Sequence, residues 1–172
     1  MLEFEIAPPR ADEKTTLVAM LDMQRATVLW KLDGLSLEDA KRPLVESGTS
    51  LLGSIKHLAY VEKWWFEDFI AGGSPENPYS EKSPDGEWRI EEDETIEGIS
   101  QFYVDAVEAS NVIINNAPDL DVLGSMDAGP VHRRQRSLRW VLVHMVEETA
   151  RHAGQMDIMR ELVDNATGYY PE

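Results

Sequence analysis

The stretch Val141–Leu162, VLVHMVEETARHAGQMDIMREL, has the apolar spacing of a core-facing helix, yet it carries charged and titratable groups within that apolar face. In a helix of about 100° per residue, side chains four positions apart lie on one ridge, and His144, Glu148 and His152 form such a ridge. Met145 and other apolar residues flank it. A buried carboxylate without a compensating group costs on the order of several kcal/mol, so Glu148 needs a partner.

Three interpretations of Glu148 are open at this point. In the first, Glu148 pairs with a histidine or an arginine, and the histidines are ordinary core residues. In the second, Glu148 and a histidine form a general acid/base pair without a metal. In the third, a cation compensates the carboxylate, because His and Glu four residues apart on one helix face can provide two metal ligands.

The stretch 51–66, LLGSIKHLAYVEKWWF, adds a third candidate ligand. His57 is a polar residue on the apolar face of this predicted helix. Together with Glu148 and His152 it provides three neutral or anionic donors, the minimum for a catalytic type of metal site with an open position. Two histidines and one carboxylate suit zinc, and they are also compatible with iron(II), nickel or manganese.

Helical periodicity, rather than the alternation typical of strands, dominates the rest of the chain. Long helices are predicted over about residues 12–33, 50–71, 95–116 and 137–164, with a further helical turn beginning at Ser36. The Pro-, Gly- and Ser-rich residues 72–93 predict a long crossover loop, and we expect its Trp88 to pack back onto the domain, over the mouth of a pocket. The pattern predicts an all-α protein, a four-helix bundle with one long crossover loop, forming a single domain over residues 1–172.

Charge and composition limit the classes of partner. The chain has 172 residues with 16 basic and 32 acidic side chains, and its formal net charge is −16. Binding to nucleic acid depends on neutralising phosphate charge, so this balance argues against a nucleic-acid partner. No apolar run reaches the roughly 20 residues of a membrane span, and the N-terminal residues lack the pattern of a signal peptide. We therefore expect a cytoplasmic protein with no membrane or nucleic-acid partner.

The sequence contains no cysteine. Disulfides, thiolate metal ligands and cysteine nucleophiles are therefore all absent from the chain. Any metal must be held by His, Asp or Glu side chains, and any thiol chemistry must use a thiol from another molecule.

Two segments resemble the DinB-like (DinB/YfiT) superfamily of metalloenzymes, and more narrowly its actinobacterial branch of unknown function. They are LLGSIKHL followed by VEKWWF in residues 51–66, and LRWVLVHMVEETARHAGQMDIMREL in residues 138–162. The segments LDMQRATVLWKLDGLS (21–36) and DGEWRIEEDETIEGISQFYVDAVEAS (85–110) also fit this branch. The resemblance implies a four-helix bundle, usually a homodimer, which binds a divalent metal through a histidine of the second helix and two ligands of a later helix.

Many relatives have histidines at both later positions, whereas here Glu148 stands four residues before His152. In this respect the chain is similar to the mycothiol-dependent maleylpyruvate isomerases, which use His, Glu and His. The resemblance therefore implies His57, Glu148 and His152 as the ligands. His144 lies about 12 Å along the helix axis from His152. We expect it to support a ligand or to pack in the core rather than to bind the same ion.

The resemblance implies a divalent-metal-dependent enzyme with a low-molecular-weight thiol of the mycothiol type as co-substrate. Such an enzyme is an S-transferase or isomerase acting on a small electrophilic substrate. We expect Ser54, Trp64 and Arg151 to line the pocket, with Arg151 meeting an anionic group. One alternative is a metal-dependent hydrolase of a small molecule, because the same ligands can activate water. Another is a non-catalytic, metal-stabilised binding module, which predicts a fourth protein ligand that closes the site.

Overall fold

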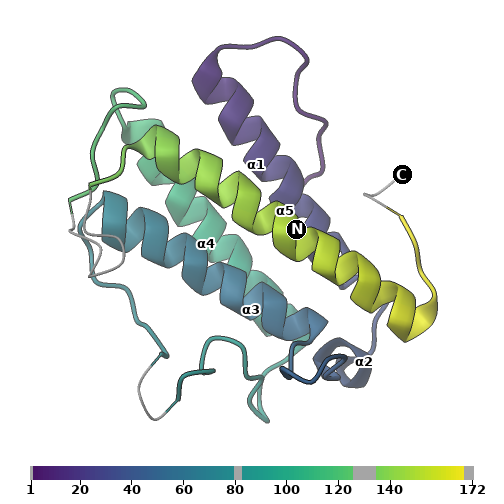
Figure 1. Cartoon of the computed structure of the whole chain (residues 1–172). Coiled ribbons are helices and arrows are strands. Elements are labelled where there is room, and N and C mark those ends of the chain that lie inside the picture. The colour runs from purple at the N-terminus through teal and green to yellow at the C-terminus, as the bar shows by residue number, and fades with distance from the viewer. Residues whose placement is uncertain (1, 80–82, 126–134, 169–172) are drawn as a thin grey trace.

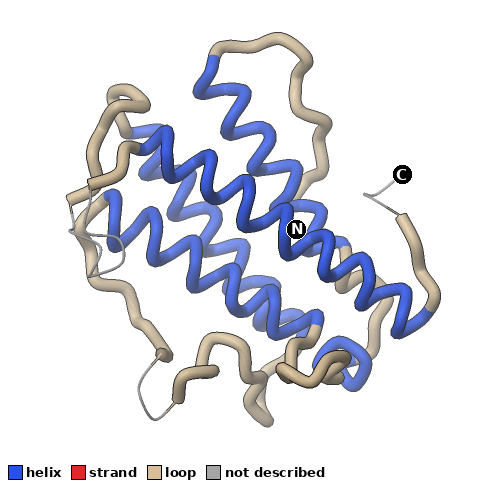
Figure 2. The backbone as a smooth tube through the Cα atoms, viewed as in Figure 1, coloured by secondary structure: helices blue, strands red, loops and turns tan. Residues whose placement is uncertain are grey.

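The computed structural model describes residues 2–79, 83–125 and 135–168, and the regular structure of these residues is helical (Figures 1 and 2). The elements are α1 (Glu13–Trp30), α2 (Leu37–Lys41), α3 (Leu51–Glu62), the π-helix η1 (Lys63–Ile70), α4 (Ile96–Asn116) and α5 (Leu138–Asp164). An isolated antiparallel bridge joins Leu123 to Ser137. The prediction of an all-α, DinB-like fold is confirmed. None of the described helices is both long and apolar enough to cross a lipid bilayer.

The long helices pack side by side, with α2 at one end of the group (Figure 1). Helix α1 lies along α5, α3 lies along α4, and α3 also packs against α5. Two buried apolar clusters fill the space between them. The first joins α3, α4 and the C-terminal half of α5, and the second joins η1 to the N-terminal half of α5. Along α5 the second cluster extends to Met145 and the first begins at Ala153, so the ridge residue Glu148 lies where the two clusters meet.

The helix starts agree closely with the predicted ones because each is set by a local cap. At the start of each of the five α-helices a side-chain oxygen accepts a hydrogen bond from the backbone N–H three residues later, which satisfies a donor that the helix itself leaves unpaired. The five capping residues are Asp12, Ser36, Ser50, Thr95 and Ser137.

The second predicted helix differs from expectation in its last eight residues, which form the π-helix η1 instead of a continued α-helix. The backbone N–H of Ala71 bonds to the carbonyl of Phe66, five residues before it, at 3.0 Å. Such wide turns are rare and frequently occur at functional sites. Here two neighbouring indoles that contact each other have different further surroundings: Trp65 packs against the His144 ring of α5, while Trp64 lines a cavity. Hydrophobic periodicity alone does not distinguish a π-turn from an α-turn, which is why the sequence did not predict it.

A buried ion pair connects α1 to α3. Arg25 is fully buried, and its Nε and Nη2 atoms donate to the two carboxylate oxygens of the equally buried Glu62 at 2.8 and 2.7 Å. Its Nη1 atom donates to Asp22 at 2.8 Å and to Asn111 of α4 at 2.9 Å. The planar guanidinium thus bonds to groups of three helices, and this bidentate geometry is the one in which a buried pair can offset its desolvation cost.

Replacing Glu62 by Gln leaves the Arg25 charge without its bidentate partner, and we expect the free energy of unfolding to fall by about 3–5 kcal/mol. Urea denaturation followed by circular dichroism measures this loss. The matched control is Glu147→Gln, which removes the partner of the exposed Arg151 side chain and should leave the unfolding midpoint unchanged. Equal midpoints for the two variants would contradict a structural role for the buried pair.

Candidate metal centre

Three side chains from two helices converge between the apolar clusters. His57 projects from α3, and Glu148 and His152 project from successive turns of α5. One potential ligand atom from each of the three residues lies within 4.8 Å of the other two. The Glu148 Oε1 atom is 3.6 Å from Nε2 of His57 and 3.4 Å from Nε2 of His152. Both imidazoles therefore present the same nitrogen to the carboxylate.

These separations fit a shared cation better than direct hydrogen bonds. An N–H···O bond in a protein spans about 2.7–3.2 Å, which is shorter than either distance. A tetrahedral zinc with ligand bonds of about 2.0–2.1 Å holds its ligand atoms roughly 3.3–3.4 Å apart. The two imidazole nitrogens and one carboxylate oxygen are also donors that zinc accepts. The residues present therefore fit a divalent metal.

The charges of the cluster depend on one another. The contacts with His152 and then with His57 lower the pKa of Glu148 well below its ordinary range, against an opposing effect of burial. Burial by itself lowers the pKa of His57, but the contacts with Glu148 and Glu87 outweigh it and the net shift is upward. The carboxylate is therefore ionised, and it meets the two histidines at a partly buried position where an uncompensated charge would be costly.

The long connection between η1 and α4 packs against this cluster. The Trp88 indole stacks on the His57 ring with 3.9 Å between centroids and 13° between planes. This agrees with the expectation that Trp88 packs back onto the helices. The close approach needs a glycine on α3, because a Cβ added at Gly53 would lie 2.5 Å from the carbonyl oxygen of Trp88.

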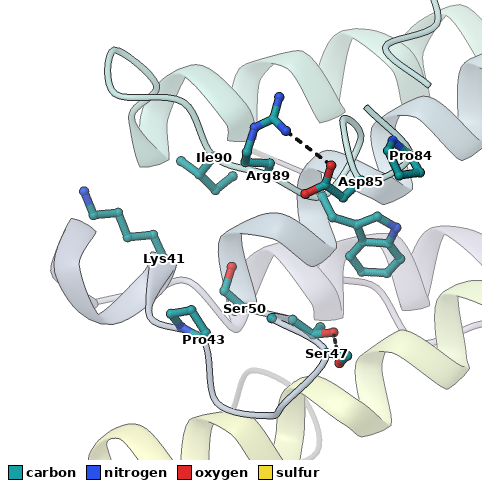
Figure 3. Close-up of a pocket in the computed structure, with 11 residues that line it drawn as sticks. Lys41, Pro43, Ser47, Ser50, Pro84, Asp85, Arg89 and Ile90 are labelled. Carbon is teal, nitrogen blue, oxygen red and sulfur yellow. Dashed lines mark hydrogen bonds and ion pairs between the residues drawn. The ribbon is translucent and has the colours of Figure 1, made fainter. Parts of the chain in front are cut away.

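One cavity adjoins the cluster at His57, and a second lies beyond Trp88. The first has a volume of about 260 Å³, and its wall includes the His57 ring. Its lining residues are His57, Tyr60, Val61, Lys63, Trp64, Asp68, Pro75, Glu76, Asn77, Tyr79 and Glu87. The second, of about 470 Å³, lies between the α2–α3 connection and residues 84–90, with Trp88 in its wall. Figure 3 shows Lys41, Pro43 and Ser50 on one side of this second cavity and Arg89 and Ile90 on the other.

Of the three residues predicted to line the pocket, one lines a cavity beside the cluster and two do not. Trp64 lines the first cavity. Ser54 is fully buried and donates to the carbonyl oxygen of Ser50 at 2.9 Å, and it lines neither of the two cavities. Arg151 is exposed on α5, where it pairs with Glu147, and it lines neither cavity either. Glu147 stands four residues before Arg151 in the sequence, and this ion-pair spacing could have indicated that Arg151 faces outward.

His144 belongs to an aromatic group apart from the cluster. Its ring stacks on Trp140 with 5.2 Å between centroids and meets the edge of Trp65 at 4.8 Å. Of the two roles expected for His144, support of a ligand or packing in the core, these contacts correspond to packing. Conversely, Glu87, whose Oε1 atom lies 3.2 Å from Nδ1 of His57, was not predicted from the sequence, because a loop has no periodicity that indicates which way a side chain faces.

Comparison with known proteins gives one match. The family model described as Mycothiol-S-transferase matches residues 16–165, most of the chain. No protein with a curated description matches the sequence. The matched range includes all three residues of the cluster and the connection that carries Trp88.

Two glycines on helices allow the contact of the connection with α3 to be tested. Gly53→Ala places a methyl group against the Trp88 carbonyl, and we expect a loss of about 1–3 kcal/mol in the free energy of unfolding with a shift in tryptophan fluorescence. Gly154→Ala on α5 is the control, because nothing lies within 4 Å of its added Cβ. It should instead gain roughly 0.5–1 kcal/mol from helix propensity. Stabilisation of both variants in urea denaturation would show that the contact is not close.

Proposed function

Because this chain belongs to the mycothiol S-transferase family, a DinB-like family, we propose that it is a divalent-metal-dependent transferase. The proposed reaction joins the sulfur of a low-molecular-weight thiol of the mycothiol type to a small electrophilic molecule. The observation that carries the proposal is the convergence of His57, Glu148 and His152 beside a cavity. The homodimer and the cytoplasmic location expected from the sequence stay predictions.

The ligands of the metal would be Nε2 of His57, Nε2 of His152 and the carboxylate of Glu148. Zinc is the proposed ion, and iron(II), nickel and manganese are compatible with the same donors. A divalent cation bound there supplies Lewis acidity, which favours the thiolate form of a thiol at neutral pH. Within the described residues no fourth metal-binding side chain joins the group, which supports an open site over a closed structural one.

The walls of the first cavity indicate which electrophiles fit. Tyr60 and Trp64 give it an aromatic surface near His57, suited to an apolar substrate body. Lys63 is the one basic side chain among the described lining residues, and it pairs with Glu67 at 3.0 Å. Three carboxylates, those of Asp68, Glu76 and Glu87, line the same cavity. A neutral electrophile therefore suits the cavity better than an anionic one, since like charges repel at this range.

The transfer itself requires little from the chain beyond binding and orientation. As the sulfur–carbon bond forms, the leaving group departs with the bonding electrons, and the thiol proton is released. The chain contains no cysteine, so no thiol of its own competes with the co-substrate.

Metal analysis tests the proposed ligands. Protein purified without added metal should contain about one equivalent of a divalent metal by mass spectrometry, as three protein ligands imply. His57→Ala and Glu148→Ala should each lose it, because two ligands rarely retain an ion. His144→Ala is the control, since this ring packs between two indoles away from the cluster and its loss should spare the metal. Metal-free wild-type protein that also fails to bind zinc on reconstitution would overturn the proposal.

A thiol-transfer assay tests the reaction. With mycothiol and a neutral alkyl halide that becomes fluorescent on alkylating a thiol, the wild-type protein should accelerate thioether formation. Glu148→Ala should reduce the rate at least about 100-fold. Losing a residue that only supports a metal ligand costs about 10- to 100-fold, and losing the ligand itself should cost more. Glu147→Ala, one residue away but exposed and outside the cluster, should retain the wild-type rate.

The same protein assayed with esters and amides separates the hydrolase alternative. Cleavage of these substrates without consumption of thiol would contradict the transferase and would support activation of water instead. Full metal content with no turnover in either panel would support the metal-stabilised binding module.

A further inference from the structure

Of the three candidate ligands, His57 is the one that the long connection between η1 and α4 contacts through two successive residues. The Trp88 indole covers a face of the imidazole at 3.9 Å, nearly parallel to it. The Glu87 carboxylate lies at the ring edge, with Oε1 3.2 Å from Nδ1. The ring is therefore contacted on its face and on its Nδ1 edge by one short piece of chain, and the same indole lies 5.5 Å from the His152 ring between centroids.

The Glu87 carboxylate lies beside Nδ1 of His57, the ring nitrogen that does not face Glu148. The Nδ1 atom is buried, and Oε1 of Glu87 at 3.2 Å is within ion-pair distance of it but outside hydrogen-bond geometry; no other carboxylate of the described residues lies within ion-pair distance. When Nδ1 carries the proton and points it at Glu87, Nε2 is left with its lone pair directed at Glu148 and His152. A carboxylate on the far nitrogen is the usual means by which a ligating histidine is fixed in one tautomer and orientation.

The connection is itself fixed to the same face of α3. Lys56, 5% exposed, donates from Nζ to the carbonyl oxygen of Arg89 at 2.8 Å and to the Glu94 carboxylate at 2.8 Å. One turn earlier, Gly53 lets the Trp88 carbonyl approach. Positions 53, 56 and 57 lie on one helix face, so a single surface of α3 carries the histidine and holds the segment that contacts it.

Ion pairs between residues of the connection order its solvent-facing side. The Arg89 guanidinium pairs with Asp85 at 3.2 Å and with Glu91 at 2.9 Å, and Figure 3 shows the first of these pairs beside the second cavity. Both partners are partly exposed, so these contacts add order to the turn rather than much stability. Residues 85–91 thus form a compact turn with Glu87 and Trp88 on its inner side.

We propose that Glu87 and Trp88 are positioning residues that hold the His57 ring with Nε2 directed at Glu148 and His152. Glu87 fixes the tautomer and Trp88 fixes the plane of the ring. The role of this pair in metal binding rests on the metal site proposed above. Its effect on the orientation of His57 is a property of the protein with or without a metal.

The matched variants are Glu87→Ala and Glu76→Ala. Both remove a carboxylate that lines the first cavity from the same connection, but only Glu87 lies within ion-pair distance of His57. Zinc affinity is measured by competition with a chromophoric chelator. Glu87→Ala should weaken zinc binding about 10- to 100-fold, and Glu76→Ala should stay within about twofold of wild type. Trp88→Phe should bind zinc more tightly than Trp88→Ala, because only the former keeps an aromatic face on the imidazole.

A second measurement uses metal-free protein. Two-dimensional ¹H–¹⁵N spectra of the imidazole, recorded above the titration range of His57, report the fraction of each tautomer. Wild type and Glu76→Ala should show the Nδ1–H tautomer of His57, whereas Glu87→Ala should shift it toward Nε2–H, since the Glu148 carboxylate, 3.6 Å from Nε2, remains to favour a proton there. Circular dichroism confirms that each variant is folded.

The outcomes separate this inference from the function proposed above. Wild-type protein that binds no zinc would overturn the metal site, while the tautomer shift in Glu87→Ala would still establish the positioning role. Zinc affinity and tautomer populations that are the same in Glu87→Ala and Glu76→Ala would overturn the inference, even if the wild type holds its metal and transfers thiols.

Discussion

The ionised Glu148 carboxylate, set into the apolar contact between α3 and α5, is the constraint around which this end of the molecule is arranged. A charge at a half-buried position must be compensated. The compensation comes from His57 across the helix contact and from His152 one turn along α5. Because Glu148 must lie close to His57, the contact constrains the position of α5 along α3. The two apolar clusters pack on either side of this contact.

The protein solves the problem of a buried charge in two different ways. Arg25 and Glu62 form two hydrogen bonds of 2.7 and 2.8 Å. Because the two charged groups are paired in this way, both side chains can be fully buried in the core. The Glu148 cluster keeps its atoms 3.4–3.6 Å apart and stays partly accessible beside a cavity. The first arrangement is closed and holds helices together. The second leaves a spacing between its atoms that suits the proposed metal ion, whereas the first leaves none.

One part of the irregular connection between η1 and α4 is held against α3 by close and buried contacts. Gly53 and Lys56 provide the space and the buried donor that bring Trp88 and Arg89 against α3. Loops that carry function are commonly positioned by a rigid scaffold in this way. Here one face of one helix contributes a candidate ligand and also the anchor for the segment that orients it, so the geometry of the centre depends on both.

The sequence by itself determined the helix starts and the ridge of Glu148 and His152, because both depend on local spacing. Each capping side chain accepts a hydrogen bond from the N–H three residues later, and a four-residue interval places Glu148 and His152 on one helix face. That His57 meets this ridge depends on the packing of α3 against α5. Tertiary structure alone decided what those faces meet. Arg25 and Glu62 are 37 residues apart and pair only because α1 and α3 lie together. Glu87 faces His57 through a loop without periodicity, and Arg151 turns to solvent despite its place next to the ridge. Local spacing sets where a side chain points on its own element, whereas its partners are set by packing between elements far apart in the chain.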